Sequence, residues 1–173
     1  MKIVIIDGQG GRMGALLCDR IMKKRTSLSA EYPNTSSGTE ARTEPAAQPA
    51  AAPSFEKGTP ADWALYAIGT NSIATAAMLK AGADYGATGE NPVLTACRDA
   101  DYIIGPLGIL AADSLLGEVT PAMAVAVGQS RAQKILLPIN RCNHHVVGVQ
   151  EASITALADQ AVDYLCSCLL AGQ

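Results

Sequence analysis

Two spacings of hydrophobic residues alternate along this chain. Short continuous apolar runs are typical of strands buried on both faces, and stretches in which apolar residues return every three or four positions are typical of helices that cover a core. The strands that this pattern predicts are residues 2–6, 64–68, 83–87, 102–105 and 134–139. The predicted helices are residues 11–24, 72–81, 91–100, 120–129 and 153–170. For the third of these helices, a strand at residues 93–97 is an alternative.

Strands that alternate with helices predict an α/β fold in which helices cover both faces of one sheet. We expect a three-layer, Rossmann-like, mostly parallel sheet. One strand departs from this rule, because only a few residues separate the strand at 134–139 from an apolar run at 145–149. Such a short connection is too short for a parallel crossover, so we expect the last strand to be antiparallel.

Residues 26–62 have a different composition from the rest of the chain. They are rich in Ala, Pro, Ser, Thr, Glu and Gly and show no apolar period. A segment of this kind cannot bury enough surface to offset the entropy of ordering it. We therefore expect a single Rossmann-like domain over residues 1–173 that carries a flexible low-complexity insertion at 26–62.

Composition and charge exclude several classes of protein. The formal net charge is −3 and the longest basic run has three residues, which argues against a nucleic-acid partner. No apolar run reaches the length of about 18 residues that crosses a bilayer, so we expect no membrane partner. Five cysteines without a preceding secretory signal favour a reducing, cytoplasmic location.

A glycine-rich turn follows the first strand, with the sequence GQGGRMG at residues 8–14. A strand, a Gly-x-Gly turn and a helix in this order are typical of dinucleotide sites, where backbone N–H groups and the helix N-terminus face a pyrophosphate. A tight turn without a ligand is the alternative. The residues that this hypothesis assigns to cofactor binding are Gly8, Gln9, Gly10, Gly11, Arg12, Met13 and Gly14.

The end of this turn, Gly11-Arg12-Met13-Gly14, resembles the glycine loop of dihydrodipicolinate reductases. The resemblance implies that Gly8 and the residues from Gly11 to Gly14 contact a nicotinamide dinucleotide. It covers only the first strand and the first helical turn. The catalytic stretch of that family is absent from this sequence, so its reaction does not carry over.

Further polar and glycine residues follow other predicted strands, and ligands of open α/β sheets bind outside the carboxyl ends of strands. These additional cofactor-binding candidates are Thr70, Asn71, Ser72, Gly105, Pro106, Gly108, Asn140 and Arg141. Arg141 is a candidate anion clamp. Each group also has a structural interpretation, because Thr70 or Ser72 could cap the next helix, and the glycines, Pro106 and the 140–145 stretch could form turns.

Three residues are candidates for catalysis. Asp7 is either a cap of the glycine turn or a general base or magnesium ligand. Glu118 lies near a predicted helix start, where a carboxylate is often structural. Cys142 follows Arg141, which would favour the thiolate. Cys142 and His144 alone are a weak metal signal, so we predict no metal site.

A wider resemblance covers most of the chain outside the insertion. The motifs DGQGG (7–11), GTNSIATAAMLKAGAD (69–84), GATGEN (86–91), ADSLLGEVTPAMAVAVGQS (112–130) and LPINRC (137–142) are similar to those of a bacterial family, domain of unknown function 3842. The resemblance implies a Rossmann-like fold and no assigned activity. The insertion at 26–62 departs from the short first crossover of that family.

These observations predict a protein that binds a nucleotide. No carboxylate follows the second strand in the sequence, which favours NADP(H) over NAD(H), and hydride transfer is then the leading reaction class. One alternative is a non-enzymatic nucleotide sensor or scaffold, with Leu165, Leu169 and Leu170 in a homodimer interface. Another is a magnesium-dependent phosphoryl-transfer site at Asp7.

Overall fold

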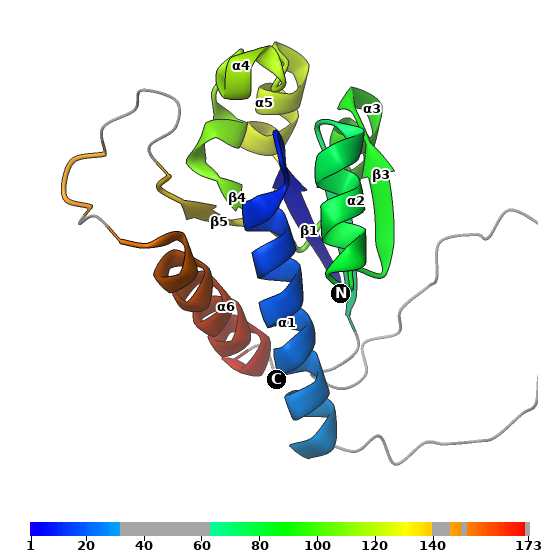
Figure 1. The fold of residues 1–173 in the computed structure, drawn as a ribbon, viewed down its shortest axis with the longest axis vertical. Coiled ribbons are helices and arrows are strands. Elements are labelled where there is room, and N and C mark those ends of the chain that lie inside the picture. The colour runs from blue at the N-terminus through cyan, green and yellow to red at the C-terminus, as the bar shows by residue number, and fades with distance from the viewer. Residues whose placement is uncertain (32–62, 140–145, 150–151, 172–173) are drawn as a thin grey trace, which may run out of the picture.

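The sheet of this protein has five strands, all of them parallel (Figure 1). The computed structural model describes residues 1–31, 63–139, 146–149 and 152–171. The strands are β1 (Lys2–Asp7), β2 (Ala64–Gly69), β3 (Tyr85–Thr88), β4 (Tyr102–Pro106) and β5 (Gln133–Leu137), and their order in the sheet is β3-β2-β1-β4-β5. This arrangement confirms the α/β class and the parallel sheet.

Helices cover both faces of this sheet. They are α1 (Arg12–Glu31), α2 (Ser72–Lys80), α3 (Glu90–Asp99), α4 (Ser114–Gly117), α5 (Pro121–Gln129) and α6 (Ile154–Ala171), and η1 (Leu107–Leu110) is a short 3-10 helix. On one face α1 packs between α2 and α6, and on the other α3 packs against α5. Residues 90–99 are therefore helical, and the alternative strand at 93–97 is wrong. The predicted cap of α5 is confirmed, since Thr120 Oγ1 accepts a hydrogen bond from the amide of Met123 at 3.2 Å.

The hydrophobic core has two layers, one on each face of the sheet. Alternate residues of β1 point to opposite faces, so Ile3 and Ile5 pack beneath α1, α2 and α6, whereas Val4 and Ile6 pack beneath α3 and α5. All four side chains are buried. This double burial explains why the first strand reads as an unbroken apolar run.

The predicted antiparallel last strand is wrong for the residues that the structure describes. Residues 146–149 form a turn in which the amide of Val149 bonds to the carbonyl oxygen of Val146 at 3.3 Å. Gly148 lies in the left-handed region with φ of 86°, and Val147 is 88% exposed. The apolar residues of this run have no layer to cover them, so their hydrophobicity alone did not indicate a strand.

Helix α1 is longer than the sequence predicts. It continues to Glu31 instead of ending near residue 24, and thus includes the first residues of the expected insertion. The hydroxyls of Thr26 and Ser27 bond back to the carbonyl oxygens of the preceding turn, and Leu28 is buried. The remainder of the insertion, residues 32–62, lies outside the described residues.

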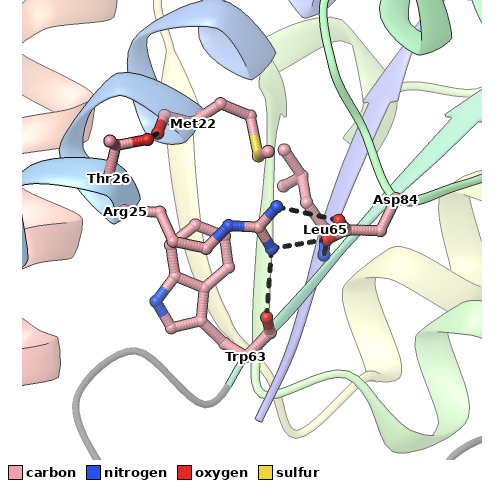
Figure 2. A network of polar contacts seen from close by, with 6 residues as sticks. All are labelled: Met22, Arg25, Thr26, Trp63, Leu65 and Asp84. Carbon is pink, nitrogen blue, oxygen red and sulfur yellow. Dashed lines mark hydrogen bonds and ion pairs between the residues drawn. The ribbon is translucent and has the colours of Figure 1, made fainter. Parts of the chain in front are cut away.

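An arginine of α1 fixes this helix to the start of β2 (Figure 2). The guanidinium of Arg25 donates two hydrogen bonds to the carboxylate of Asp84, at 2.7 and 2.8 Å, and a longer one to the carbonyl oxygen of Trp63 at 3.4 Å. It also lies over the indole ring of Trp63, 4.7 Å from the centroid. Asp84 in turn accepts the amide of Leu65 at 2.8 Å, so one contact set joins α1, β2 and the segment before β3.

Helix α6 is long and apolar enough to cross a membrane by length and composition alone. In this structure one face of it packs on α1, where Leu165 and Leu169 are buried in the core. Ion pairs join Arg20 to Asp159 at 3.2 Å and Lys24 to Asp163 at 3.0 Å. Two of the three leucines that we expected in a dimer interface therefore serve the core of their own chain, and Leu170 alone is exposed.

Candidate functional site

The glycine turn lies at the point of the sheet from which the chain proceeds to one side first and to the other side later. From β1 the chain proceeds through α1 to β2 and β3, and from β3 it returns through α3 to β4 on the other side of β1. In open α/β sheets this point, outside the carboxyl ends of the two central strands, is where ligands bind. A cavity of about 70 Å³ lies here, with room for roughly five water-sized groups. Its lining consists of Asp7, Gly8, Gln9, Gly10, Gly11, Arg12, Met13, Pro106, Gly108, Leu115, Ile139 and Ile154.

Asp7 ends β1 and caps both the glycine turn and helix α1. One carboxylate oxygen, Oδ1, accepts the amide of Gly8 at 2.8 Å, and the other, Oδ2, accepts the amide of Gly14 at 2.7 Å. Burial raises the pKa of Asp7, the two amides lower it, and the nearby charge of Glu118 raises it, so that the pKa lies above its usual value. The capping role expected for this residue is confirmed.

Glu118 reaches the glycine turn from the segment before α5. Its Oε2 atom accepts hydrogen bonds from the amide of Gln9 at 2.8 Å, from Thr70 Oγ1 at 2.5 Å and from Asn71 Nδ2 at 2.8 Å. Burial raises the pKa of Glu118, but these three donors outweigh it and the pKa lies below its usual value. Among the described residues, no donor bonds to the other oxygen, Oε1.

The packing of the chain explains three of the four glycines in the turn. A Cβ atom at Gly8 would lie 2.5 Å from Thr70 Oγ1 and 2.6 Å from Glu118 Oε2. At Gly11, where φ is 65°, it would lie 2.6 Å from the Cα of Ala74, and at Gly14 it would lie 2.4 Å from the sulfur of Met78. Among these four glycines, only at Gly10 would it meet no atom of a described residue within 4 Å.

The amides of this turn are largely bonded within the chain. Those of Gly8 and Gly14 donate to Asp7, that of Gln9 donates to Glu118, and that of Gly11 donates to the carbonyl oxygen of Gly8 at 2.9 Å. The expectation that these four amides converge on an external phosphate is therefore wrong for this conformation. Two carboxylates of the chain accept three of these donors and a backbone carbonyl accepts the fourth, because a buried N–H group needs a partner.

The other predicted binding residues divide into two groups. Pro106 and Gly108 line the cavity, as expected. Gly105 does not, because its missing Cβ makes room for the carbonyl oxygen of Ile6 inside the sheet.

Helix α2 has a different cap from the two expected. The cap is Asn71, whose Oδ1 accepts the amide of Ala74 at 2.9 Å, and neither Thr70 nor Ser72 takes that role. Ser72 is exposed as the first residue of the helix. Asn140, Arg141 and Cys142 lie outside the described residues; they follow Ile139, which lines the cavity.

The sequence did not indicate that Glu118 bonds to the glycine turn and to the end of β2. The segment that brings it there has an unusual backbone, with Asp113, Leu115 and Leu116 in the left-handed region at φ of 62°, 54° and 62°. Each such residue costs about 1–2 kcal/mol. The buried side chain of Leu115 also lines the cavity, and no local motif predicts this conformation for a leucine.

The described residues offer no ready metal site. No group of three or more His, Cys, Asp or Glu side chains lies together among them. Both oxygens of Asp7 already accept amide hydrogen bonds. The magnesium hypothesis for Asp7 therefore gains no set of ligands from this part of the chain.

Comparisons with known proteins give one match. The family described as domain of unknown function (DUF3842) matches residues 50–169, a range that contains Glu118 and the end of β2 but not the glycine turn. No curated protein and no solved structure matches the chain.

Proposed function

Because the chain belongs to the DUF3842 family, whose description assigns no activity, we propose its function from the geometry of the site. The protein binds a nucleotide whose ribose has free hydroxyl groups, and a nicotinamide dinucleotide of the NAD(H) type is the first candidate. The site lies at the carboxyl edge of the sheet, between the glycine turn and the end of β2.

The topology of the sheet supports this proposal. The order β3-β2-β1-β4-β5 is that of the first five strands in the Rossmann dinucleotide-binding fold. In the Rossmann fold the glycine turn joins the first strand to the first helix, and here the glycine turn joins β1 to α1. The cavity of about 70 Å³ holds only one group of a dinucleotide, so the rest of the ligand would lie along the open edge of the sheet.

The position of Glu118 is the observation that carries the proposal. In that fold an acidic residue at the end of the second strand bonds to the ribose hydroxyls of the cofactor. Here Glu118 comes from far along the chain, and Thr70 and Asn71 hold it at the end of β2 through Oε2. Oε1 is then the acceptor for a ribose hydroxyl.

This position also changes the expected cofactor. The preference for NADP(H) depended on the lack of a carboxylate after the second strand. A carboxylate held at that place would repel a 2′-phosphate, whereas it would accept a hydrogen bond from a 2′-hydroxyl. We therefore favour NAD(H) over NADP(H).

The phosphate groups of the ligand would lie over Gly10 and Arg12. No atom of the part of the chain that the structure describes lies within 4 Å of a Cβ built on Gly10. Arg12 is an exposed cation in the first turn of α1, where the helix dipole also favours an anion.

The proposal concerns binding, and hydride transfer stays a prediction from the sequence. Asp7 and Glu118 are the predicted catalytic residues that the structure describes, and both are engaged by backbone or side-chain donors. Cys142 lies outside the described residues. What the geometry supports is recognition of a ligand.

Isothermal titration of the purified chain with NADH, NADPH, ATP and inorganic phosphate tests the proposal. We expect NADH to bind more tightly than NADPH, and inorganic phosphate to bind least. Fluorescence of Trp63 is a poor reporter, because this residue precedes β2 at the opposite edge of the sheet. The absence of heat with every nucleotide would contradict the proposal.

Two variants test whether a change in nucleotide binding can be separated from a change in stability. Gly10→Ala places a methyl group where no atom of a described residue lies within 4 Å, so it should weaken nucleotide binding and leave the melting temperature unchanged. Glu118→Gln should reduce the preference for NADH over NADPH, because a neutral amide no longer repels the 2′-phosphate. Equal affinities of wild type and Gly10→Ala would place the ligand elsewhere.

A further inference from the structure

Helix α5 is apolar on its outer face as well as on its inner face. Its sequence, PAMAVAVGQ, contains no charged residue. Met123 and Val127 are buried against the sheet, whereas Ala122 is exposed and Val125 is 53% exposed. A helix that is apolar all round is typically covered on all sides.

A groove runs between this face and helix α3. Its volume is about 510 Å³, and apolar residues of both helices are part of its lining. The two helices lie side by side in the same direction. Ser130 Oγ bonds to the carbonyl oxygen of Cys97 at their carboxyl ends, and Thr120 Oγ1 bonds to Glu90 at their amino ends. The lining residues are Leu94, Cys97, Arg98, Ala122, Val125, Ala126, Gln129, Ser130 and Arg131.

Charges of opposite sign lie at the two ends of this groove. Arg98 and Arg131 are exposed at the carboxyl ends of the helices, and neither forms an ion pair with a described residue. Glu90 is exposed at the amino ends. Rotation of such a surface by 180° places its acidic end against its own basic end, so the surface is complementary to itself.

We propose that the α3/α5 face binds a second copy of this chain in an antiparallel, twofold symmetric dimer. In a twofold interface the same patch contacts itself. Val125 of each copy inserts between α3 and α5 of the other, and Glu90 of each copy faces Arg98 and Arg131 of the other. This interface lies on the opposite face of the sheet from α6.

Sedimentation equilibrium of the full chain over a wide range of concentrations tests this proposal. We expect wild type to shift from monomer to dimer as the concentration rises, and Val125→Glu to stay monomeric. Two matched controls carry the same change at exposed apolar residues elsewhere, Leu170→Glu on α6 and Ile73→Glu on α2. Both should dimerise like wild type. A monomeric wild type at every concentration, or a loss of dimer in a control but not in Val125→Glu, would overturn the proposal.

Charge reversal gives a second test that does not depend on the fold tolerating a glutamate at position 125. Glu90→Arg alone should weaken the dimer, and so should the double change Arg98→Glu with Arg131→Glu. All three changes in one chain exchange the two ends and should restore the dimer. If the triple variant dissociates at least as readily as either partial one, the antiparallel arrangement is wrong.

Discussion

The Oε2 atom of Glu118 lies 2.8 Å from the amide nitrogen of Gln9, a residue 109 positions away in the chain. This hydrogen bond gives the glycine turn an acidic partner from another part of the fold. The turn thus has its acidic partner within the chain, and among the described residues no donor bonds to the other oxygen of this carboxylate, Oε1. The motif and its partner form a single unit, although only the motif is recognisable in the sequence.

Removal of the Glu118 carboxylate should destabilise the fold. Glu118→Ala leaves the amide of Gln9 and the side chains of Thr70 and Asn71 without their shared acceptor. A hydrogen bond to a charged group contributes about 1.5–3 kcal/mol. At this half-buried site, water replaces part of the lost interactions. We therefore expect the free energy of unfolding to fall by roughly 1–3 kcal/mol. Urea denaturation measures it. Asp113→Asn, a neutralised exposed carboxylate of the same segment, should change the value by less than about 0.5 kcal/mol.

Asp7 should make stability depend on pH in the direction opposite to most carboxylates. Because its pKa is raised in the folded state, its contribution is present in full below the unfolded pKa of about 3.9 and is lost as the pH rises through the folded pKa. Asp7→Asn removes this dependence, so wild type should lose more stability than the variant as the pH rises from 4 to 7. A parallel pH dependence of the two proteins would contradict the raised pKa.

The same substitution should nevertheless destabilise the protein at neutral pH. Both oxygens of Asp7 accept amides, and asparagine offers one acceptor and one donor group. The amide of Gly8 or Gly14 is then left without a partner, at a cost of about 1–3 kcal/mol. Chemical denaturation at pH 7 gives this value, and a variant as stable as wild type would show that the turn had rearranged.

Gly8 and Glu118 should be energetically coupled. An alanine at position 8 would place its Cβ 2.6 Å from Glu118 Oε2 and 2.5 Å from Thr70 Oγ1, so it must displace the carboxylate or the threonine. Gly8→Ala in the Glu118→Ala background should cost less than in wild type, and the double-mutant cycle should give a coupling of about 1 kcal/mol or more. Additive effects would mean that the methyl group disturbs Thr70 or Leu115 and leaves the carboxylate in place.

A conservative change of Arg25 should weaken the junction between α1 and β2. Lysine keeps the charge but loses the two parallel hydrogen bonds to Asp84 and the planar group that stacks on Trp63. We expect Arg25→Lys to lower the free energy of unfolding by about 1 kcal/mol. Lys23→Arg, in an exposed pair on the same helix, is the matched control and should have little effect. An unchanged transition in Arg25→Lys would show that a point charge is sufficient at this junction.

Most elements of the fold could be predicted because their signals are local. The buried run of β1 and the Thr120-Pro121 start of α5 depend on residues that are neighbours in the chain. The apolar run before α6 misled the prediction, because Gly148 turns the backbone there and Val147 and Val149 stay exposed. Whether such a run is covered depends on the tertiary structure.

The candidate site was only partly predictable for the same reason. Gly10, Arg12 and Pro106 line the cavity as expected, since they follow strands whose ends meet at one edge. The sequence suggested Glu118 as a catalytic candidate but not its hydrogen bonds to Gln9 and Thr70. These bonds depend on leucines with a left-handed backbone conformation, which leucine does not favour. Gly8 and Gly14, which the sequence suggests as ligand contacts, also make room for side chains of the protein itself, and Gly8 lines the cavity.

Helix α1 is long enough to separate the glycine turn from the junction between α1 and β2. The helix has 20 residues, which at 1.5 Å per residue span about 30 Å, and it leads from the glycine turn to Glu31 at the far edge of the sheet. The chain re-enters the sheet at that same far edge, where the amide of Ala64 bonds to the carbonyl oxygen of Met1. Both ends of the segment between Glu31 and Trp63 therefore lie at the edge of the sheet opposite the glycine turn, so we expect tags or reporters joined there to lie away from the candidate site.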